Sequence, residues 1–282
     1  MNKPLHIVPG LDDPCNGIAV AAKLLACGQD AMLADMRMFT SEQIVAASEV
    51  WVHSMWMPLV WRACRAVKAA GRPLIRMTHA NLDPVRLAYH GWKKRLVSPV
   101  EHRLLRMADK IIATCDAEAG WIRAYEPRVK RIDVVDLKKF FSLPKEAPPS
   151  ICDGKRPIHL LYMGRRHPLK GLDVLETATK GLDGFELRIV SDVVGAEKEK
   201  VWEWCDVLVL PTMSENFGLV VAEALERGRR VVATDGAPVW EGQPGVVYVK
   251  GFRAGNAAVR AGLLREALLR LPPVRVAVDK GT

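Results

Sequence analysis

The sequence predicts an α/β protein made of two Rossmann-like domains. Short apolar runs, of the kind that form buried parallel strands, alternate with longer stretches whose apolar residues recur at helical spacing. This alternation is interrupted once, at residues 142–157, where four prolines occur without any periodicity. We therefore expect an N-terminal domain at residues 1–141, a linker at 142–157 and a C-terminal domain at 158–282.

The elements of the N-terminal domain follow from local patterns. Strands are expected where apolar runs stand between turn residues, and helices where apolar residues recur every three or four positions. In the last helical stretch, Ser98 followed by Pro99 and Glu101 indicates a restart with a serine N-cap. The expected strands are 5–8, 31–36, 50–53, 74–77 and 110–114, and the expected helices are 18–26, 58–70 and a long stretch from 85 through 104.

The C-terminal domain repeats the same alternation of strand and helix. Such alternation is typical of parallel sheets with crossover helices, and ligands bind at the carboxyl ends of their strands. The expected strands are 158–163, 185–190, 206–210, 230–234 and 246–249, and the expected helices are 172–180, 198–204, 217–227 and 257–270.

The composition favours a globular protein. Of the 282 residues, 49% are hydrophobic, which is enough to build a core. No apolar run approaches the ~20 residues that span a bilayer, and the start MNKPLHIVPG is too short and too interrupted for a signal peptide. The six cysteines are scattered with no C-x-x-C pair, so we expect reduced thiols in a cytoplasmic protein and no zinc site.

The stretch 206–228, DVLVLPTMSENFGLVVAEALERG, carries the clearest chemical pattern. A buried strand is followed by a polar turn and by a helix that ends at Gly228. This arrangement presents free backbone N–H groups and a positive dipole end to an anion. Glu215 stands just before the expected helix and Glu223 eight residues later, so the two acids can reach different groups of one ligand.

A second pattern, GRRHPLKGL at 164–172, follows a strand and opens a helix. Arg165 and Lys170 stand five residues apart across this turn. They can converge on one diphosphate, because Arg offers a planar fork of donors and Lys a point charge. Either pattern alone also fits an ordinary surface turn, but their order and separation in one chain indicate a nucleotide site.

Residues 92–95, 101–106, 108–114, Glu118 and 236–241 resemble bacterial polysaccharide and lipopolysaccharide glycosyltransferases. Together the two patterns resemble the family-four retaining glycosyltransferases of the GT-B fold. The resemblance rests on ENFGLVVAE at 215–223 and on the G-R-x-x-x-x-K-G pattern at 164–171. It implies two Rossmann-like domains that face a central cleft, with the nucleotide-sugar donor bound by the C-terminal domain.

The resemblance also implies roles for individual residues. Arg165 and Lys170 would hold the donor's diphosphate. Glu215 would meet a hydroxyl of the transferred sugar, and Glu223 would bind the ribose hydroxyls. The start of the helix would face the phosphates through Asn216, Phe217, Gly218 and Leu219.

The N-terminal half carries a weaker likeness to the same family. Gly17 follows the first strand, where the family has a glycine turn near donor phosphate and acceptor; a plain N-capped helix start fits these residues as well. His79 stands at a strand end, at the place of the family's histidine that contacts the donor sugar, and a structural histidine would also fit there.

The expected reaction breaks the bond between the anomeric carbon and a phosphate oxygen, so negative charge grows on the leaving nucleoside diphosphate. Arg165 and Lys170 would stabilise that charge. No D-x-D motif occurs in the chain. We therefore expect cations supplied by the protein rather than a metal, and no cofactor besides the donor, for which a UDP-sugar is the expectation. Retention of anomeric configuration is implied by the resemblance only.

The net charge of +9 is uneven, because residues 1–150 hold 22 Lys and Arg against 15 Asp and Glu. A basic half suggests a phosphorylated acceptor, an anionic membrane or nucleic acid, and a merely solvated surface also fits. With no recognised nucleic-acid module, nucleic acid is not expected. The basic, aromatic helix between Arg86 and Arg106 could lie on the inner face of the cytoplasmic membrane, or pack its apolar side into the core.

The sequence therefore predicts a cytoplasmic glycosyltransferase that acts on a saccharide or lipid-linked acceptor in bacterial surface-glycan assembly. Two alternatives stay open: a GT-B relative such as a sugar-nucleotide epimerase, and a non-catalytic nucleotide-sugar-binding subunit. The second is suggested by Ser191 and Asp192, which stand where the family has a glycine-rich turn.

Overall fold

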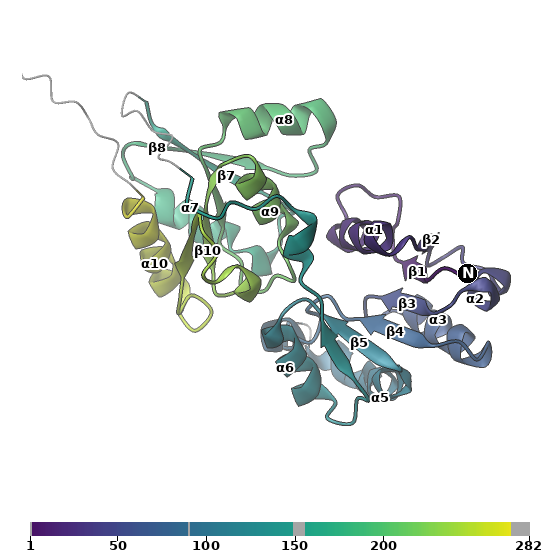
Figure 1. Ribbon diagram of the computed structural model, residues 1–282. Coiled ribbons are helices and arrows are strands. Elements are labelled where there is room, and N and C mark those ends of the chain that lie inside the picture. The colour runs from purple at the N-terminus through teal and green to yellow at the C-terminus, as the bar shows by residue number, and fades with distance from the viewer. Residues whose placement is uncertain (1, 90, 149–155, 272–282) are drawn as a thin grey trace, which may run out of the picture. The chain divides into compact units, whose positions relative to one another are not determined.

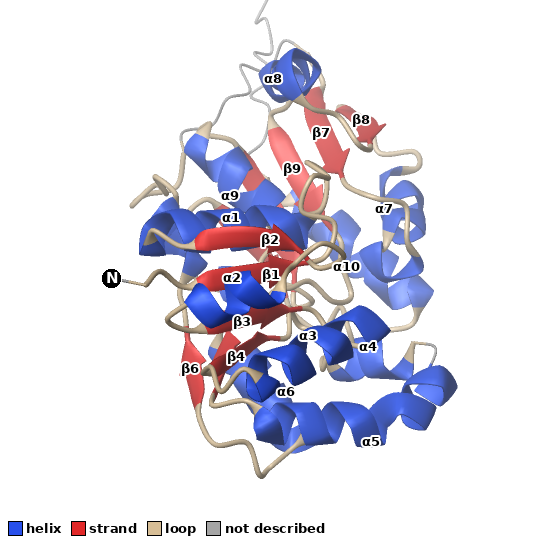
Figure 2. Cartoon of the chain, turned by 90° about the vertical axis from the view of Figure 1, so that its right-hand side faces the viewer, coloured by secondary structure: helices blue, strands red, loops and turns tan. Residues whose placement is uncertain are grey.

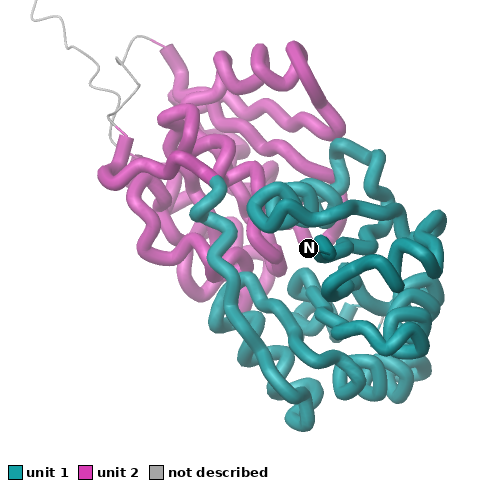
Figure 3. Tube along the Cα trace, turned by 45° about the vertical axis from the view of Figure 1, so that its right-hand side comes forward, with its two compact units in different colours: residues 1–140 teal, residues 141–282 magenta. Residues whose placement is uncertain are grey.

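The protein divides into two compact units, residues 1–140 and 141–282 (Figure 3). The computed structural model describes residues 2–89, 91–148 and 156–271. Within these residues, no helix is both long enough and apolar enough to cross a membrane. Five cysteines are free thiols, and Cys152 lies outside the described residues.

Unit 1 is built on a parallel sheet with the strand order β2-β1-β3-β4-β5-β6 (Figure 1). Its strands are β1 (Leu5–Val8), β2 (Met32–Asp35), β3 (Val50–His53), β4 (Leu74–Met77), β5 (Lys110–Ala113) and β6 (Ile132–Val134). Its helices are α1 (Gly17–Gln29), α2 (Ser41–Ala46), α3 (Pro58–Ala69), α4 (Pro84–Ala88), α5 (Gly91–Met107) and α6 (Asp116–Tyr125), and a 3-10 turn, η1 (Leu137–Phe140), follows.

Helices cover both faces of this sheet, because successive strand residues point to opposite sides. Leu5 of β1 belongs to a cluster with Val60 of α3 and Leu104 of α5. Val8, three residues on, packs against Ala19 of α1. A sheet buried on both faces explains why most residues of its central strands are apolar.

Unit 2 is a second parallel sheet, in the order β11-β10-β9-β7-β8. Its strands are β7 (Ile158–Met163), β8 (Phe185–Val190), β9 (Val207–Leu210), β10 (Arg230–Thr234) and β11 (Val246–Val249). Its helices are α7 (Leu172–Thr179), α8 (Gly195–Trp204), α9 (Leu219–Glu226) and α10 (Ala257–Leu269), with 3-10 turns η2 (Pro168–Lys170) and η3 (Pro238–Trp240) (Figure 2). The central strand β9 is buried along its whole length.

The predicted helix restart at Ser98 is wrong. α5 runs without a break through Pro99, and the Ser98 hydroxyl forms a hydrogen bond of 2.6 Å with the hydroxyl of Tyr125 on α6. The break lies earlier, where α4 ends at Ala88 and Tyr89 takes an extended conformation. A serine before a proline resembles an N-cap in sequence, but here its side chain is held by a partner on another helix.

Three elements of unit 1 were not expected: α2, α6 and β6. The signal for α2 was present, since Thr40 and Gln43 form a reciprocal capping box at its start. Helix α6 begins with acidic residues in its first turn, which complement the helix dipole.

The described part of the predicted linker packs on unit 2. The Ser142 amide donates to the Glu226 carboxylate at 2.8 Å, and Arg230 donates to the Pro148 carbonyl at 3.0 Å. Residues 149–155 of that linker lie outside the described residues.

Three histidines are buried among the described residues of unit 1: His6 on β1, His53 on β3 and His79 just after β4. Burial is the main cause that lowers the pKa of each imidazole. The His53 pKa lies well below its usual value, and that of His79 falls to about 3, helped by the nearby charge of Arg86. The folded protein therefore holds these rings neutral.

We expect the free energy of unfolding to fall as pH drops from about 7 to about 5. In the unfolded chain the imidazoles bind protons below their ordinary pKa of about 6.5, and the folded chain does not bind them. Each ring adds a slope of up to roughly 1 kcal/mol per pH unit. Urea denaturation across this range measures it, with His53→Gln expected to give a shallower slope. A flat profile would contradict the buried neutral state.

Candidate functional site

Three loops of unit 2 leave the same edge of the sheet. Residues 164–171 follow β7, residues 211–218 follow β9 and residues 235–237 follow β10. These strands are neighbours and parallel, so their carboxyl ends lie side by side. In open α/β sheets this edge is where ligands bind.

Backbone hydrogen bonds join these loops. The Met213 amide donates to the Leu169 carbonyl at 2.8 Å, and the Glu215 amide donates to the Gly236 carbonyl at 2.7 Å. The Thr212 hydroxyl donates to the Leu169 carbonyl at 3.1 Å. The loop after β9 is therefore held on one side by the loop after β7 and on the other by the loop after β10.

Two glycines allow the loops to approach so closely. A Cβ atom on Gly171 would overlap the carbonyl oxygen of Pro211, and one on Gly236 would overlap that of Thr212. Gly171 also has a φ of 65°, in the left-handed region that favours glycine. The close approach places residues on either side of Gly171 against the loop after β9.

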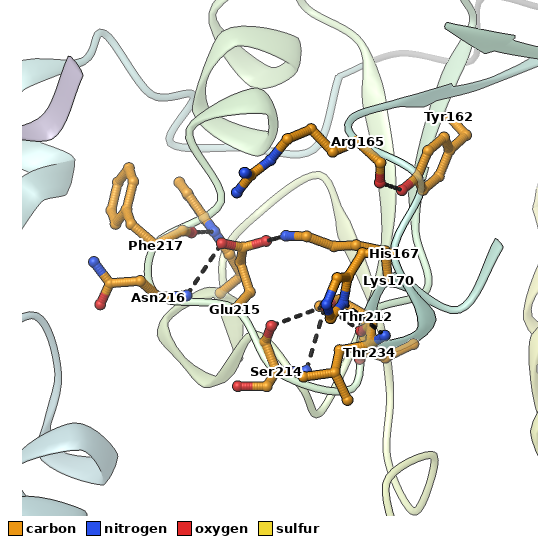
Figure 4. A network of polar contacts seen from close by, with 12 residues as sticks. Tyr162, Arg165, His167, Lys170, Thr212, Ser214, Glu215, Asn216, Phe217 and Thr234 are labelled. Carbon is orange, nitrogen blue, oxygen red and sulfur yellow. Dashed lines mark hydrogen bonds and ion pairs between the residues drawn. The ribbon is translucent and has the colours of Figure 1, made fainter. Parts of the chain in front are cut away.

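Here Lys170, in the loop after β7, lies against Glu215, in the loop after β9. Lys170 Nζ is paired with Glu215 Oε2, and the Asn216 amide donates to Glu215 Oε1 at 3.1 Å (Figure 4). The side chains of Lys170 and Glu215 are 20% and 15% exposed, so the pair is mostly shielded from water. In Figure 4 the side chains of Arg165 and Lys170 run in the same direction, toward Glu215. The exposed Arg165 guanidinium and this pair form one polar group.

Tyr162 of β7 supports this group through the backbone of Arg165. Its hydroxyl donates to the carbonyl oxygen of Arg165 at 3.0 Å. Burial, together with the negative charge of Glu215, raises the pKa of Tyr162 to about 12. The phenol therefore stays protonated and holds the start of the loop at residues 164–171 in place.

The helix after this turn begins later than the sequence suggested. α9 starts at Leu219, and Gly218 before it has a φ of 73°. Phe217 is buried, its ring packs against Phe141 and Trp240, and its carbonyl accepts from Trp240 Nε1. Phe217 thus shapes the turn from inside the core. The predicted helix start at residue 217 was wrong. Phe217 is buried in the core and Gly218 takes a left-handed conformation, so the helix begins only at Leu219.

Glu223 lies four residues into α9, so it stands only about 6 Å along the helix axis from Leu219. Its carboxylate is paired with Lys198 of α8, at 2.9 Å to Oε1 and 2.7 Å to Oε2. Sequence reasoning missed Lys198, because nothing distinguishes it from the other lysines of a polar helix. The structure therefore leaves each of the two acids with its own lysine.

The remaining predicted residues belong to unit 1. Gly17 is the exposed first residue of α1, preceded by Asn16, whose side chain accepts from the Ile18 amide and donates to the Pro9 carbonyl. The N-capped helix start that the sequence left open is therefore present. Gly17 stands at the carboxyl end of β1.

His79 stands at the carboxyl end of β4 in a strained backbone, with φ of 53°, and Ala80 follows with φ of 54°. Glu118 of α6, which is buried, holds this turn. Its carboxylate accepts from the Thr78 hydroxyl at 2.7 Å and the Ala80 amide at 2.6 Å, and from the amide and hydroxyl of Thr114 at 2.8 Å each. Sequence reasoning did not assign Glu118 this role, since Thr78 and Ala80 are distant from it in the chain.

Within residues 2–89, 91–148 and 156–271, no three His, Cys, Asp or Glu side chains are grouped as a metal site would require.

Two family models match the chain. Residues 46–137 match the "Glycosyl transferase 4-like domain" and residues 129–261 match "Glycosyl transferases group 1". Both models describe glycosyl transferases, and together they span residues 46–261.

Two similar curated proteins share a name. This chain is 29% identical to the D-inositol 3-phosphate glycosyltransferase of Paenarthrobacter aurescens over 208 residues. That aligned region covers 58% of this chain and 51% of the relative. This chain is 28% identical over 240 residues to the protein of that name from Segniliparus rotundus, covering 68% of this chain and 53% of the relative. The chain thus spans about half the length of these relatives.

Solved structures show that this chain has the GT-B fold. Sucrose-phosphate synthase from Thermosynechococcus elongatus superposes with a TM-score of 0.64 at 14% identity, over 95% of this chain and 90% of that chain. HepE from Anabaena, in complex with UDP and glucose, gives 0.63 at 14% identity over the same shares. At such identity the likeness is one of fold.

We expect Gly171→Ala to destabilise unit 2 more than Gly181→Ala. Both glycines have φ near 65°, so both variants bear the left-handed strain of about 1–2 kcal/mol. Only at Gly171 does the new methyl group meet a backbone carbonyl, since Gly181 has open space around it. Overpacking of this kind costs a further 1–3 kcal/mol or so. Urea denaturation of both variants measures the difference, and equal losses would contradict the close approach of the loops.

Proposed function

We propose that this chain is a retaining, metal-independent glycosyltransferase that moves a sugar from a nucleotide-sugar to an acceptor of bacterial surface glycan. The observation that carries the donor half of this proposal is the Lys170–Glu215 pair. It lies at the carboxyl edge of the sheet with Arg165 beside it. A cation and an acid held together at this edge suit a ligand that is anionic at one end and bears hydroxyls at the other.

The cations have a clear task in such a reaction. The bond between the anomeric carbon and the diphosphate oxygen breaks, a bond to the acceptor oxygen forms, and the proton of the acceptor hydroxyl is taken up by the leaving diphosphate. Arg165 and Lys170 would meet the charge that grows on that group. A diphosphate would give Lys170 a stronger anionic partner than Glu215 alone, which frees Glu215 to accept from a sugar hydroxyl.

The Lys198–Glu223 pair suits the ribose. Two contacts to one ammonium hold the Glu223 carboxylate in place, and its side chain is 24% exposed, so the carboxylate can still accept from a hydroxyl. That HepE is solved with UDP supports a uridine nucleotide as the first donor to test.

Two acceptors are candidates. The sequence resemblance favours a lipid-linked saccharide or lipopolysaccharide. The name of the curated relatives favours a second candidate, an inositol phosphate, which is soluble and anionic. A transfer assay with a common donor distinguishes them, since the radiolabelled sugar appears in the lipid fraction in one case and in the aqueous fraction in the other.

A membrane-bound acceptor would suit one surface of unit 1. On α5, Trp92 is 64% and Leu96 73% exposed, four residues apart and so on one side of the helix, and Lys93 and Arg95 beside them are exposed too. The apolar residues that α5 buries, Leu104 and Leu105, lie at its other end. Exposed aromatic and aliphatic groups among cations are typical of helices that rest on anionic lipid. We propose that this surface contacts the inner face of the cytoplasmic membrane.

The donor proposal is tested by thermal shift with UDP, GDP, ADP, CMP and their sugar conjugates. Binding at about 100 times the dissociation constant adds about 2.7 kcal/mol, enough to move the midpoint by several degrees. We expect a shift with one nucleotide, lost in Glu223→Ala and kept in Glu203→Ala, which changes an exposed acid on α8.

No shift with any nucleotide would contradict the transferase proposal. A shift with no transfer, epimerisation or hydrolysis would favour the non-catalytic nucleotide-sugar-binding subunit. A shift followed by epimerisation or hydrolysis without acceptor would favour a GT-B relative with other chemistry.

The membrane proposal is tested by co-sedimentation with vesicles rich in phosphatidylserine or made of phosphatidylcholine alone. We expect binding to the anionic vesicles only, reduced roughly tenfold or more in a Trp92→Ser, Leu96→Ser variant, because burial of such side chains contributes about 1.5–3 kcal/mol each. The matched control is Met38→Ser, Val45→Ser, which removes exposed apolar groups elsewhere in unit 1. Equal binding by both variants would contradict the α5 surface.

A further inference from the structure

Strand β8 lies at one edge of the sheet of unit 2, beside β7 (Figure 2). Within the residues that the structure describes, β7 is its only strand neighbour. An edge strand presents a row of backbone N–H and C=O groups on its outer side, and such a row can pair with another strand. The outer side of β8 is therefore a candidate interaction surface.

The hydrogen bonds to β7 show which backbone groups of β8 face outward. The Ile158 amide donates to the Gly184 carbonyl at 2.9 Å, and the Gly164 amide donates to the Val190 carbonyl at 3.0 Å. Even-numbered residues of this strand therefore point their backbone groups toward β7, and the direction alternates along a strand. The outward N–H and C=O groups belong to residues 185, 187 and 189.

The side chains of β8 alternate between charged and apolar. Glu186 and Arg188 are exposed on one face of the sheet. Phe185, Leu187 and Ile189 are half-buried on the other face. Apolar side chains that are only half covered gain further burial when a neighbouring strand places its own apolar side chains beside them.

Both charged side chains rest on neighbouring rings. The Arg188 guanidinium lies over Trp204, 4.1 Å from the ring centroid. Glu186 Oε2 is 3.7 Å from Nε2 of His159, whose ring stacks on Trp204. Stacking engages the flat face of the guanidinium, so its edge N–H groups can still reach a carboxylate. Charges on an edge strand commonly discourage pairing, but these two are of opposite sign and two residues apart, so an antiparallel neighbour can match them.

A second copy of the chain matches this edge in one register. Two identical surfaces form a closed pair about a two-fold axis, which makes the two β8 strands antiparallel. With the axis at Leu187, Glu186 lies opposite Arg188 of the second copy and Arg188 lies opposite its Glu186. Phe185 then lies opposite Ile189. An axis at residue 186 or 188 would instead put two like charges directly opposite each other, which is destabilising.

The same register pairs the outward backbone groups. Residues 185, 187 and 189 would exchange N–H and C=O bonds with residues 189, 187 and 185 of the second copy. The charged pairs would fall between these bonds, where opposite side chains of an antiparallel ladder are closest. We propose that β8 pairs with β8 of a second copy about a two-fold axis at Leu187, so that the sheet of one unit 2 continues into that of the other. This pairing does not depend on the proposed function.

Sedimentation equilibrium of the native chain measures the association, at protein concentrations from about 1 μM to about 1 mM. We expect a reversible dimer whose share grows with concentration. A chain that stays monomeric over the whole range would overturn the proposal.

Charge reversal tests the register. Glu186→Arg puts cations opposite cations in both pairs, and Arg188→Glu puts acids opposite acids, so we expect each variant alone to dimerise about tenfold more weakly than the native chain or worse. A mixture of the two variants should form a heterodimer about as tight as the native dimer, because each pair across the axis is again of opposite charge. Both positions are exposed, so both variants should fold, which circular dichroism checks.

The matched control is Glu241→Arg. It reverses an exposed acid that is paired with Lys250, just after the strand β11 at the other edge of the sheet, and it should leave dimerisation unchanged. If the single variants at 186 and 188 dimerise like the native chain, the dimer uses another surface and the proposal is overturned. A mixture that dimerises no better than either variant alone would overturn the register and the proposal with it.

Discussion

The close approach of three backbones at the carboxyl edge of unit 2 is the constraint on which its site depends. Gly171 and Gly236 have no side chain, so the carbonyls of Pro211 and Thr212 occupy the space where a Cβ would stand. Lys170 precedes Gly171, and this packing brings it to Glu215, 45 residues away in the chain. Thr234 reinforces the approach, because its hydroxyl donates to the Thr212 carbonyl. Without this close approach, the loops at residues 164–171 and 211–218 would be two separate surface turns.

Unit 1 depends on a different constraint, which is that its buried polar groups must find partners. Glu118 is buried and still accepts four hydrogen bonds, so its carboxylate ties the turn at residues 78–80 to the start of α6. The three histidines meet the same demand by binding one another. His79 is hydrogen-bonded to His53, His53 to His6, and His6 to Gln29 at the end of α1.

Much of the fold could be predicted, because parallel strands between two helical layers are apolar on both sides and stand out as short runs. That Lys170 and Glu215 lie near each other could be predicted, since each follows a strand of the same parallel sheet. Lys198 was not, because a lysine on a polar helix carries no mark of its partner, Glu223. The helix restart at Ser98 failed for a similar reason, as a hydroxyl that suits an N-cap is equally suited to Tyr125.

The sequence by itself determined the α/β class, the cations at 165 and 170 and the acids at 215 and 223, because these depend on local periodicity and on residue type at short spacing. Only the tertiary structure decided which lysine is paired with which acid, where α9 begins, and that His79 is hydrogen-bonded to His53 rather than isolated. Those features depend on strand order and register, which bring together residues far apart in the chain.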